Sequence, residues 1–518
     1  MPKTNNYLIL LSALTLVPFT FAANWKTSAS VEASSEYSDN VTRGALEAQK
    51  DVILSVRPGF GLTAEGNNAS FRSRYDLKGQ HYINADDSNE VFHDLLLLGE
   101  VRALHDRLVL TSSVTANQQL ADINNGLLPD YTNNTSNLET VGSYLLGMDW
   151  NQPLANQAYI NFNTDAYYID QKANDDTLGY NLAFATQDGS DFKRTFWDLN
   201  YNLGYQKPDA DKRSLTQTSQ ATLGHGVIEH WGIFLSSYWE ENDLGQNNGQ
   251  ENIDSAAWGP GIRFSPSDRS YLDVSYNFST KKSNKDYWAS KLSWTPSIRT
   301  GLTASIGKRF YGDAYQFNAY HNVRKIRTQV SYREGIESFA SQLASQTSNT
   351  GSLICPAGPI NSLSECEFSS LTNPVVGPDQ QVVNVFTALP SASNELYLTR
   401  DGTLSSVLRA RKHTFTVTFF YVQRDYFSST PDSDDYGSQL AWAWRIGPKT
   451  SLQLNSELRY LSQDLVSETD AEQRHGIALT HTLGRRSLVV LGYTYTDRAS
   501  VQNGYHENNI KLSYQVVF

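Results

Sequence analysis

The chain has 518 residues, with 42 Lys and Arg against 54 Asp and Glu and a formal net charge of −12. This polarity excludes a bundle of membrane-spanning helices, and the net acidity argues against a nucleic-acid partner. Yet 12% of the residues are aromatic, including 29 Tyr and 10 Trp, and these side chains favour a boundary between apolar and aqueous phases.

The first 22 residues have the pattern of a cleaved Sec signal peptide. Lys3 precedes an apolar stretch from about Tyr7 to Phe19, and small residues place the expected cleavage after Ala22. The apolar stretch is shorter than the ~20 residues that a membrane anchor needs, and no later segment holds ~18 consecutive apolar residues. We therefore expect an exported protein without a transmembrane helix, in which residues 23–518 form a single domain.

Apolar and polar residues alternate along the rest of the chain. In FRSRYDLK, the residues Arg72, Arg74, Asp76 and Lys78 share one face, while Phe, Ser, Tyr and Leu form the other. The same pattern recurs in WDLNYNLGYQ, HTFTVTFFY and SLQLNSELRY. Successive side chains of a strand point to opposite faces, so each segment is predicted to be a strand with one apolar face and one wet face.

A soluble β-sandwich gives the same local alternation, but three features favour a membrane barrel. The alternation continues in units of ~10 residues with no linker between domains, aromatic residues gather near the strand ends, and short turns alternate with longer polar connections. The predicted fold is all-β: a large antiparallel up-and-down transmembrane β-barrel of about 24 strands, within a range of 18–26, in a Gram-negative outer membrane. The strand boundaries are least defined at 179–194 and 396–412.

The polar strand faces are predicted to line the lumen, because a charge facing lipid near the midplane costs roughly 2–4 kcal/mol. The mixed signs of these faces argue against a strong ion filter. The candidate contacts for a polymer or solute are Arg72, Arg74, Asp76, Lys78, Asp198, Asn200, Asn202, Gln453, Asn455, Glu457, Arg459, Lys511 and Gln515.

The sequence ends on an alternating strand, NNIKLSYQVVF, which is expected to close the barrel against the first strand at 25–37. Its residues Tyr514, Val516 and Phe518 resemble the signal that the outer-membrane barrel assembly machinery reads. We therefore expect that machinery and outer-membrane lipid as partners. A monomer is expected, because one chain of this size closes its own barrel.

Between about Ser338 and Asn394 the alternation lapses, which predicts a long extracellular loop. Such a loop is usually functional or disordered. Cys355 and Cys366 lie close together within it, and the oxidising export route predicts a disulfide between them. The loop could lie over the pore, fold into it as a constriction, or be a surface loop that the disulfide protects from proteolysis.

No catalytic motif stands out, so we expect neither an enzyme nor a cofactor. A hydrolase with Ser, His and Asp at the barrel wall is an alternative that sequence spacing leaves open. The segment HGVIEH (225–230) falls at a predicted periplasmic turn, and no metal site is expected there. The basic run Arg409, Arg411, Lys412 and His413 falls at another such turn, where it is expected to contact solvent or lipid headgroups.

The first hundred residues after the leader resemble a known family. The segments VEASSEYSDNV (31–41), DVILSVRPGFGLTAEG (51–66), YDLKGQHY (75–82) and RLVLTSSVTANQQ (107–119) are similar to outer-membrane proteins associated with the exosortase/PEP-CTERM system. The resemblance covers about a fifth of the chain and implies a β-barrel that accompanies exopolysaccharide biosynthesis and export. It transfers no catalytic residue. Asp39 and Asn40 are expected to form a turn, and Pro58-Gly59 a bend or bulge.

The sequence therefore predicts an outer-membrane pore, with a conduit for exopolysaccharide export or assembly as the first hypothesis. Polysaccharide and periplasmic polysaccharide-export proteins would be its further partners. The second hypothesis is a general or substrate-specific uptake porin for small solutes, which predicts a lumen constricted by an inward loop. The third is an anchor or adhesion barrel that presents the 338–394 loop to a partner.

Overall fold

The computed structural model describes most of the chain beyond the expected leader. The residues described are 23–43, 48–85, 89–120, 138–172, 176–189, 191–192, 194–207, 213–244, 253–281, 285–344, 352–356, 367–369, 380–383, 395–427, 430–464, 469–484, 486–501 and 503–518. The predicted signal peptide, residues 1–22, and Cys366 of the predicted disulfide lie outside these residues.

Long strands account for nearly all of the described structure. The first are β1 (Asn24–Ser38), β2 (Asp51–Glu65), β3 (Ala69–Tyr82), β4 (Glu90–Ala103), β5 (Leu108–Leu120), β6 (Leu138–Leu154), β7 (Ala158–Asp170), β8 (Thr177–Asp188) and β9 (Thr195–Lys207). The next are β10 (Ser214–Ile228), β11 (Trp231–Asp243), β12 (Ile253–Ser267), β13 (Ser270–Ser279), β14 (Tyr287–Ser297), β15 (Thr300–Arg309), β16 (Gly312–Val323) and β17 (Ile326–Ser338). The last are β21 (Leu396–Arg409), β22 (His413–Tyr426), β23 (Ser433–Arg445), β24 (Thr450–Gln463), β25 (Asp470–Thr482), β26 (Ser487–Ala499) and β27 (Tyr505–Val517).

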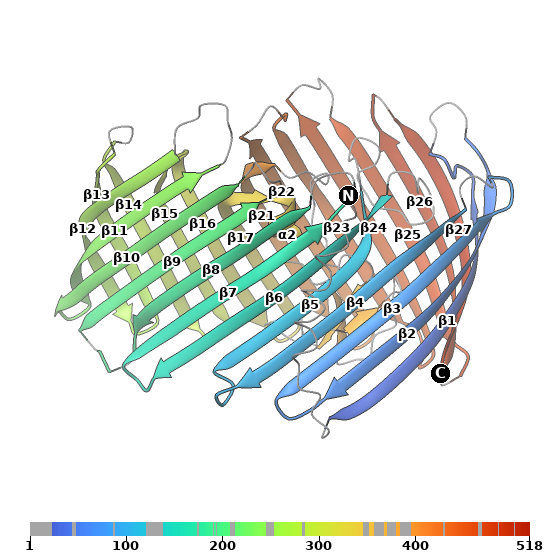
Figure 1. The fold of residues 1–518 in the computed structure, drawn as a ribbon, viewed down its shortest axis with the longest axis horizontal. Coiled ribbons are helices and arrows are strands. Elements are labelled where there is room, and N and C mark those ends of the chain that lie inside the picture. Colours follow the sequence, from blue (N-terminus) through green and yellow to red (C-terminus); the bar gives the residue numbers. More distant parts are fainter. Residues whose placement is uncertain are drawn as a thin grey trace, which may run out of the picture.

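These strands form one closed sheet. Each pairs antiparallel with its neighbours in sequence, β17 pairs with β21, and β27 pairs with β1, so the 24-stranded sheet has no free edge (Figure 1). The prediction of a large up-and-down barrel is confirmed. The two least defined regions of the sequence are also strands of this sheet, β8 and β21.

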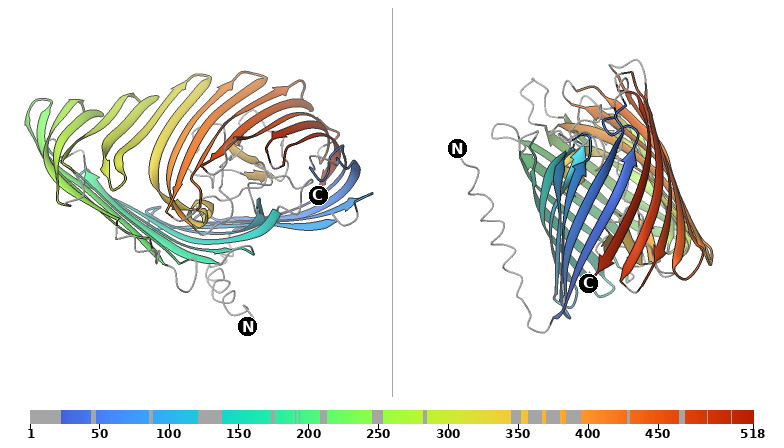
Figure 2. Two further views of the ribbon diagram at one scale, coloured as in Figure 1. Left: turned by 90° about the horizontal axis from the view of Figure 1, so that it is seen from above. Right: turned by 90° about the vertical axis from the view of Figure 1, so that its right-hand side faces the viewer.

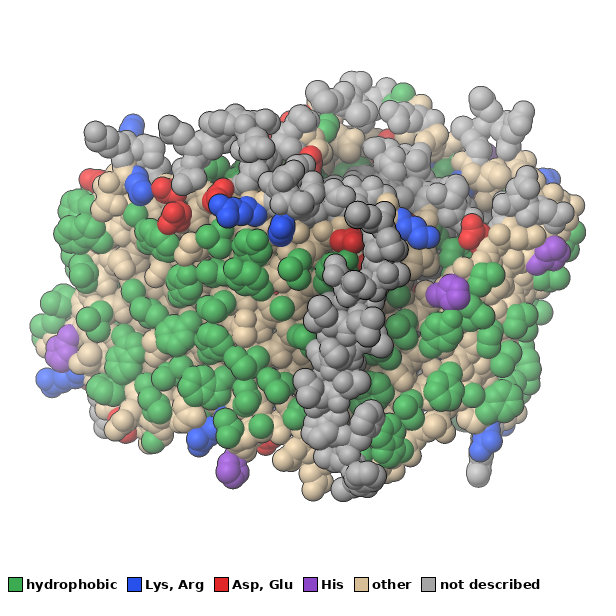
Figure 3. All heavy atoms as spheres, in the orientation of Figure 1, with side chains coloured by type: hydrophobic (Ala, Val, Ile, Leu, Met, Phe, Trp, Pro, Cys, Tyr) green, Lys and Arg blue, Asp and Glu red, His purple; other side chains and the backbone are tan. Residues whose placement is uncertain are grey.

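The outer surface of the barrel is apolar. Leu54, Val56, Phe60 and Leu235 lie on it and are about half exposed. In Figure 3, apolar side chains cover the middle of this surface, and charged side chains gather near its upper and lower edges. Aromatic pairs such as Trp442–Trp444 lie near the strand ends. An apolar band between aromatic girdles on a closed barrel is the structure of an outer-membrane protein, and the predicted location is confirmed.

The seam between β1 and β27 closes the ring. The two strands are in register from the pair Ser30–Val517 to the pair Ser38–Asn509. Beyond the last pair, the Asp39 carboxylate accepts hydrogen bonds from the backbone N–H (2.7 Å) and the side-chain amide (2.8 Å) of Asn508.

The residues that flank Asp39 add three further bonds across the seam. The Asn40 amide donates to the backbone oxygen of His506 at 3.1 Å. Ser38 Oγ and Arg43 Nε donate to the two carboxylate oxygens of Glu507, at 2.9 and 3.1 Å. Asp39 and Asn40, expected only to form a turn, therefore also clamp the last strand to the first.

Connections of different length lie at opposite ends of the barrel. Short turns join β2 to β3, β4 to β5, and each later pair up to β25 and β26, while most long connections lie at the other end (Figure 1). The exception is the two-residue connection Phe310–Tyr311 between β15 and β16, which lies at the end with the long connections. The end with short turns faces the periplasm in barrels of this kind.

The segment after β17 turns into the lumen. It begins with the helix α2 (Phe339–Ala344) and continues with the short strands β18 (Ser352–Pro356), β19 (Glu367–Ser369) and β20 (Gln380–Val383). β18 pairs with both β19 and β20. Seen from above in Figure 2, α2 and this small sheet lie inside the ring, and Figure 1 places the sheet within the height of the barrel. Among the described residues, no helix is long and apolar enough to cross a membrane.

The polarity of the outer surface can be tested at Leu235, which is 52% exposed and lies mid-strand in β11. We expect Leu235→Arg to lower the free energy of unfolding by roughly 2–4 kcal/mol, because it places a charge in lipid. The control Thr222→Arg places the same charge on the opposite face of the neighbouring strand and should cost less. Equal losses for the two variants, measured by denaturant unfolding in lipid vesicles, would contradict the assignment of the faces.

The seam clamp can be tested by Asp39→Ala. This change removes two hydrogen bonds to a charged group, each of which contributes roughly 1.5–3 kcal/mol. We expect a lower unfolding midpoint and partial loss of the compact form in unheated gel samples. Asp268→Ala, in a short turn far from the seam, is the control and should leave both measurements unchanged.

Candidate functional site

The inner face of the barrel is lined by paired charges. On β1–β4, Arg74 donates to both oxygens of Asp76, at 2.6 and 2.9 Å, while Arg57 lies 3.0 Å from Asp94 and 3.8 Å from Asp76. The two carboxylates face one another in the register of β3 and β4, so the arginines neutralise a like-charge pair. Gly59 makes room for this cluster, because a Cβ there would lie 2.2 Å from Asp76 Oδ1.

A second group of charges lies on β22–β26. Arg459 donates from Nε and Nη2 to the two oxygens of Asp435, at 2.9 and 2.7 Å, and Arg424 lies 3.5 Å from the same carboxylate. Arg498 lies 2.8 Å from Asp470. The Asp435 and Arg424 side chains are 0% and 1% exposed. Charged groups this deeply buried are stable only when paired, because removing one partner costs roughly 3–5 kcal/mol.

The structure places the predicted lumen residues in three separate regions of the wall. Arg72, Arg74, Asp76 and Lys78 alternate on β3, and Arg74 and Asp76 belong to the first charge cluster. The second charge group includes Arg459, and on the same strand, β24, Glu457 accepts a hydrogen bond from Gln439 at 3.0 Å. At the seam, Lys511 lies 3.9 Å from both Glu32 and Glu36.

The other predicted residues are less closely grouped. Asn200 and Asn202 line a cavity on the far side of the barrel, and Asp198 lies on the same strand, β9. Gln453 and Asn455 lie on β24, and Gln515 is buried on β27. A contact between any of these side chains and a transported solute stays a prediction.

The helix α2 spans the lumen. It packs against its own strand, β17, and against β6 and β7 on the opposite wall. Phe339 and Ala340 are buried there with three wall residues, Val141, Tyr167 and Ile169. Ser338 Oγ also donates to Gln206 Oε1 of β9 at 2.7 Å. An apolar patch therefore interrupts the polar lumen where α2 meets the wall. Figure 2 shows α2 inside the ring, close to that wall.

This contact divides the lumen into two parts. We call the part enclosed by β9–β17 the narrow lobe and the part enclosed by β21–β27 and β1–β6 the wide lobe; the small sheet β18–β20 lies in the wide lobe (Figure 2). In the narrow lobe the walls come within direct contact. Lys291 Nζ of β14 donates to Asp198 Oδ2 of β9 at 2.5 Å. Arg309 of β15 donates to Glu240 and Tyr238 of β11, at 2.5 and 3.1 Å.

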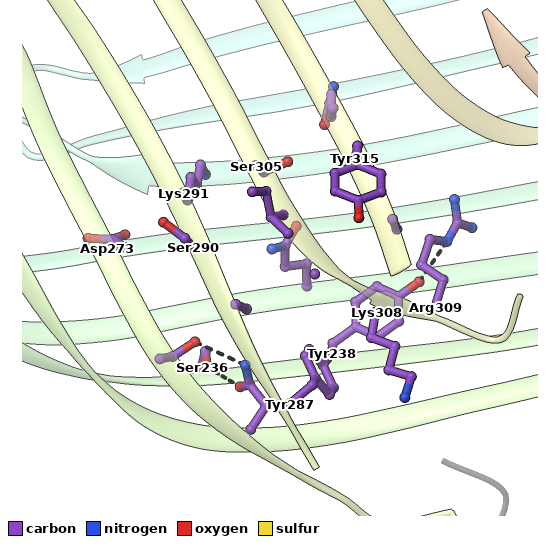
Figure 4. A pocket seen from close by; sticks show the side chains of 18 of the residues that line it. Ser236, Tyr238, Asp273, Tyr287, Ser290, Lys291, Ser305, Lys308, Arg309 and Tyr315 are labelled. Atoms are coloured by element: carbon purple, nitrogen blue, oxygen red, sulfur yellow. Dashed lines mark hydrogen bonds between the residues drawn. The ribbon is translucent and has the colours of Figure 1, made fainter. Parts of the chain in front are cut away.

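The narrow lobe contains a cavity of about 630 Å³. Figure 4 shows Ser236 and Tyr238 of β11, Tyr287 and Lys291 of β14, and Arg309 of β15 around it. Most of the lining is hydroxyl or amide: Asn200, Asn202, Thr218, Gln220, Thr222, Ser236, Ser237, Tyr238, Ser275, Asn277, Tyr287, Ser290, Ser305, Tyr311, Tyr315 and Gln316. Such side chains both donate and accept hydrogen bonds, so the lining matches the hydroxyl groups of a sugar.

An arginine packed between aromatic rings lies toward the periplasmic end of this lobe. The Arg263 guanidinium lies 3.7 Å from the ring centre of Phe196 and 4.2 Å from that of Tyr271. It also donates to both oxygens of Asp273, at 2.6 and 2.7 Å. Asp273 also lines the cavity, so this cluster keeps a carboxylate of the lining neutralised.

Sequence reasoning missed α2, the contacts between opposite walls and the Arg263 cluster. The one sequence signal for α2 was Ser338, a residue type that often caps the N-terminus of a helix, at the point where the alternation ends. Ser338 Oγ does accept a hydrogen bond from the Ser341 N–H at 3.1 Å, as an N-cap residue does. The contacts between opposite walls join strands that are not neighbours in the ring. They depend on the flattened shape of the barrel, which no local sequence pattern predicts.

Each of the two segments predicted to be turns contains a short turn together with the strand ends beside it. His225 lies near the end of β10 and His230 in the turn before β11; they contact Thr195 and the backbone oxygen of Ser265, respectively. Arg409 ends β21, and Arg411 and Lys412 are exposed in the turn before β22. Within the described residues, no group of three or more His, Cys, Asp or Glu could hold a metal ion.

Comparisons with known proteins match the whole barrel to outer-membrane proteins of very different sequence. The FrpB iron transporter from Neisseria meningitidis (F5-1 variant) aligns with 95% of this chain and 83% of its own, at 10% identity and a TM-score of 0.44. The siderophore receptor PirA from Pseudomonas aeruginosa aligns over 95% and 80%, at 7% identity and a TM-score of 0.39. OmpTdeltaL8, a loop deletion mutant of OmpT from Vibrio cholerae, aligns over 96% and 100%, at 7% identity and a TM-score of 0.34.

No protein-family model matches the sequence. No curated protein is significantly similar to it. The resemblance to the exosortase-associated family therefore stays a prediction, and no function is transferred from the solved structures.

The Arg263 cluster provides a stability test. Arg263→Gln should lower the free energy of unfolding by about 3–5 kcal/mol, because it leaves the buried Asp273 carboxylate without its cation. The double variant Arg263→Gln/Asp273→Asn should recover much of that loss, since no uncompensated charge remains. Equal instability of the single and double variants in denaturant titrations would show that the ring packing matters more than the charge.

Proposed function

We propose that this protein is an outer-membrane passage for a polyhydroxylated solute, and that the segment following β17 controls it. The observation that carries the proposal is a closed ring with a cavity lined mainly by hydrogen-bonding groups, and with α2 anchored across the lumen. Barrels of more than ~16 strands enclose aqueous space, and the largest ones are commonly plugged. Here the plugging segment comes from the chain's own connection between β17 and β21.

The finer proposal is a conduit for an exopolysaccharide. Its support is the resemblance of residues 31–119 to barrels of exopolysaccharide loci, together with the amide and hydroxyl lining of the narrow lobe. A sugar chain presents hydroxyl groups along its whole length, and a wall of Asn, Gln, Ser, Thr and Tyr can exchange hydrogen bonds with it at successive positions. The paired charges leave no strong field of one sign across the cavity.

An uptake porin for small solutes is the second candidate. The observation that favours it is the constriction itself, because an inward-folded segment that narrows the lumen is what that hypothesis predicts. The contact between α2 and β6–β7 supplies such a narrowing. The two candidates differ in the size of solute that enters: a conduit admits a long chain, whereas a constricted porin admits only short ones.

Single-channel conductance of the refolded protein tests the passage. Deleting Ser338–Asn394 and joining the ends by a short turn should raise the conductance several-fold. Phe339→Asn should raise it in part, because it weakens the packing of α2 against Val141, Tyr167 and Ile169. Phe192→Asn is the matched control: this ring lies at the short-turn end and should not affect the current.

Three outcomes would change the proposal. If neither the intact protein nor the deletion variant conducts, while both are folded, the passage is wrong and an anchor or adhesion role takes its place. If Phe192→Asn raises the current as much as Phe339→Asn, α2 is not the controlling element. If glucose oligomers but not long dextran block the current of the intact protein, which keeps the constriction at α2, the uptake porin is favoured over the conduit.

A further inference from the structure

The periplasmic rim of the barrel is strongly basic along one side. Every short turn from the one between β12 and β13 to the one between β25 and β26 carries an exposed basic side chain. One from each turn is Arg269, Arg299, Arg324, Lys412, Lys449 and Arg486. Asp268 is the one acidic residue in these turn sequences. We call this side of the rim the basic arc.

The basic arc does not follow from composition, because the chain as a whole is acidic, with a formal net charge of −12. The short turns on the rest of the rim also differ. The turns between β2 and β3 (66–68) and between β6 and β7 (155–157) hold no charged residue. The other three hold acidic residues as well: Asp106 with Arg107, Asp191 with Arg194, and Glu229 with His230. Basic charge is thus concentrated over one contiguous part of the periplasmic mouth.

Three arginines continue the basic arc into the lumen. Arg327 and Arg409 lie on neighbouring strands, and the residues beside them, Ile326 and Leu408, are exposed on the lipid face. Alternation therefore places both arginines on the inner face. Arg445 lies on the inner face of β23 by the same argument, since it follows Trp444, which stacks on the outward Trp442. We call these three the inner arginines.

We propose that the basic arc and the inner arginines form an entry site for an anionic polysaccharide that approaches from the periplasm. Positive charge at a mouth raises the local concentration of an anionic solute and its rate of entry. Arginine also binds a carboxylate through two parallel hydrogen bonds, which suits the uronate groups of an acidic sugar chain. This inference rests on the proposed function, and it names the charge class of the solute.

Two other occupants fit the geometry less well. Anionic lipid headgroups reach the outer surface and the turn tips but not side chains that face the lumen. A globular acidic protein reaches the tips of the turns, but the inner arginines lie behind them, on the wall of the barrel. A slender chain is the occupant that can contact both sets of charges at once.

Binding of oligogalacturonate to the refolded protein in neutral detergent micelles tests the proposal, with maltooligosaccharides of equal length as the neutral probe. We expect calorimetry to detect oligogalacturonate binding that weakens as salt is added, because the contacts are charge–charge, and no binding of the neutral probe. The triple variant Arg327→Gln/Arg409→Gln/Arg445→Gln should weaken binding about tenfold. The matched variant Arg299→Gln/Arg324→Gln/Lys412→Gln removes three charges at the tips and should weaken it less.

The controls separate this proposal from the passage itself. Both triple variants must show the wild-type heat-modifiable gel shift, and Arg445→Gln alone serves if the inner triple variant does not fold. Binding unaffected by the inner triple variant, or lost equally with both variants, would overturn the entry site. Vesicle binding that depends on anionic phospholipid and on the tip residues, with no oligogalacturonate binding, would assign the basic arc to lipid. The binding test does not depend on conductance. If the protein binds oligogalacturonate here but carries no current in the bilayer experiment above, the passage is wrong and the entry site still stands.

Discussion

Satisfying backbone hydrogen bonds in lipid is the constraint on which the whole structure depends. Each unpaired N–H or C=O costs several kcal/mol in the hydrocarbon region, so the sheet must close on itself. The sheet closes at one seam, where the last strand, β27, pairs with the first strand, β1. The bonds from Asp39, Asn40 and Arg43 to the last strand are placed at the outer end of this seam, where strand pairing stops.

Closure also determines what the lumen can contain. Once one strand face is given to lipid, charged side chains at the depth of the hydrocarbon region must lie on the other face, and a crowded inner face then needs ion pairs rather than isolated charges. The clusters meet this need with two arginines each around Asp76 and Asp435 and with one at Asp273. The buried apolar patch at Phe339 is the exception on this face, and it marks where a separate segment has been docked against the wall.

The alternation of side chains was enough to predict the barrel, its approximate strand number and the face on which Arg74, Asn200 and Arg459 lie. Most strands pair with the strands next to them in sequence, so the pattern of each local segment is enough to predict this fold. The pairs Lys291–Asp198 and Arg309–Glu240 join strands that are not neighbours in the ring, and no local pattern specifies them. The sequence also left the path of residues 339–344 open among several alternatives. The helix α2 is stabilised by packing against Val141, Tyr167 and Ile169, which are far from it in sequence, so no local pattern specifies its position.

The flattening of the ring links the separate features of the lumen. Contact between β17 and β6–β9 through α2 and Ser338 brings opposite walls together, which forms the narrow lobe with its hydrogen-bonding lining. The small sheet β18–β20 lies on the other side of this contact, in the wide lobe, so the segment that separates the two lobes also places a sheet in one of them (Figure 2). Under the proposed function, a solute crossing this barrel would meet a basic periplasmic mouth first and a wall of mainly hydroxyl and amide groups second. In that order, long-range electrostatic attraction acts at the periplasmic mouth, and short-range hydrogen bonds act further inside the lumen. Weak, exchangeable hydrogen bonds would let a sugar chain move along the wall.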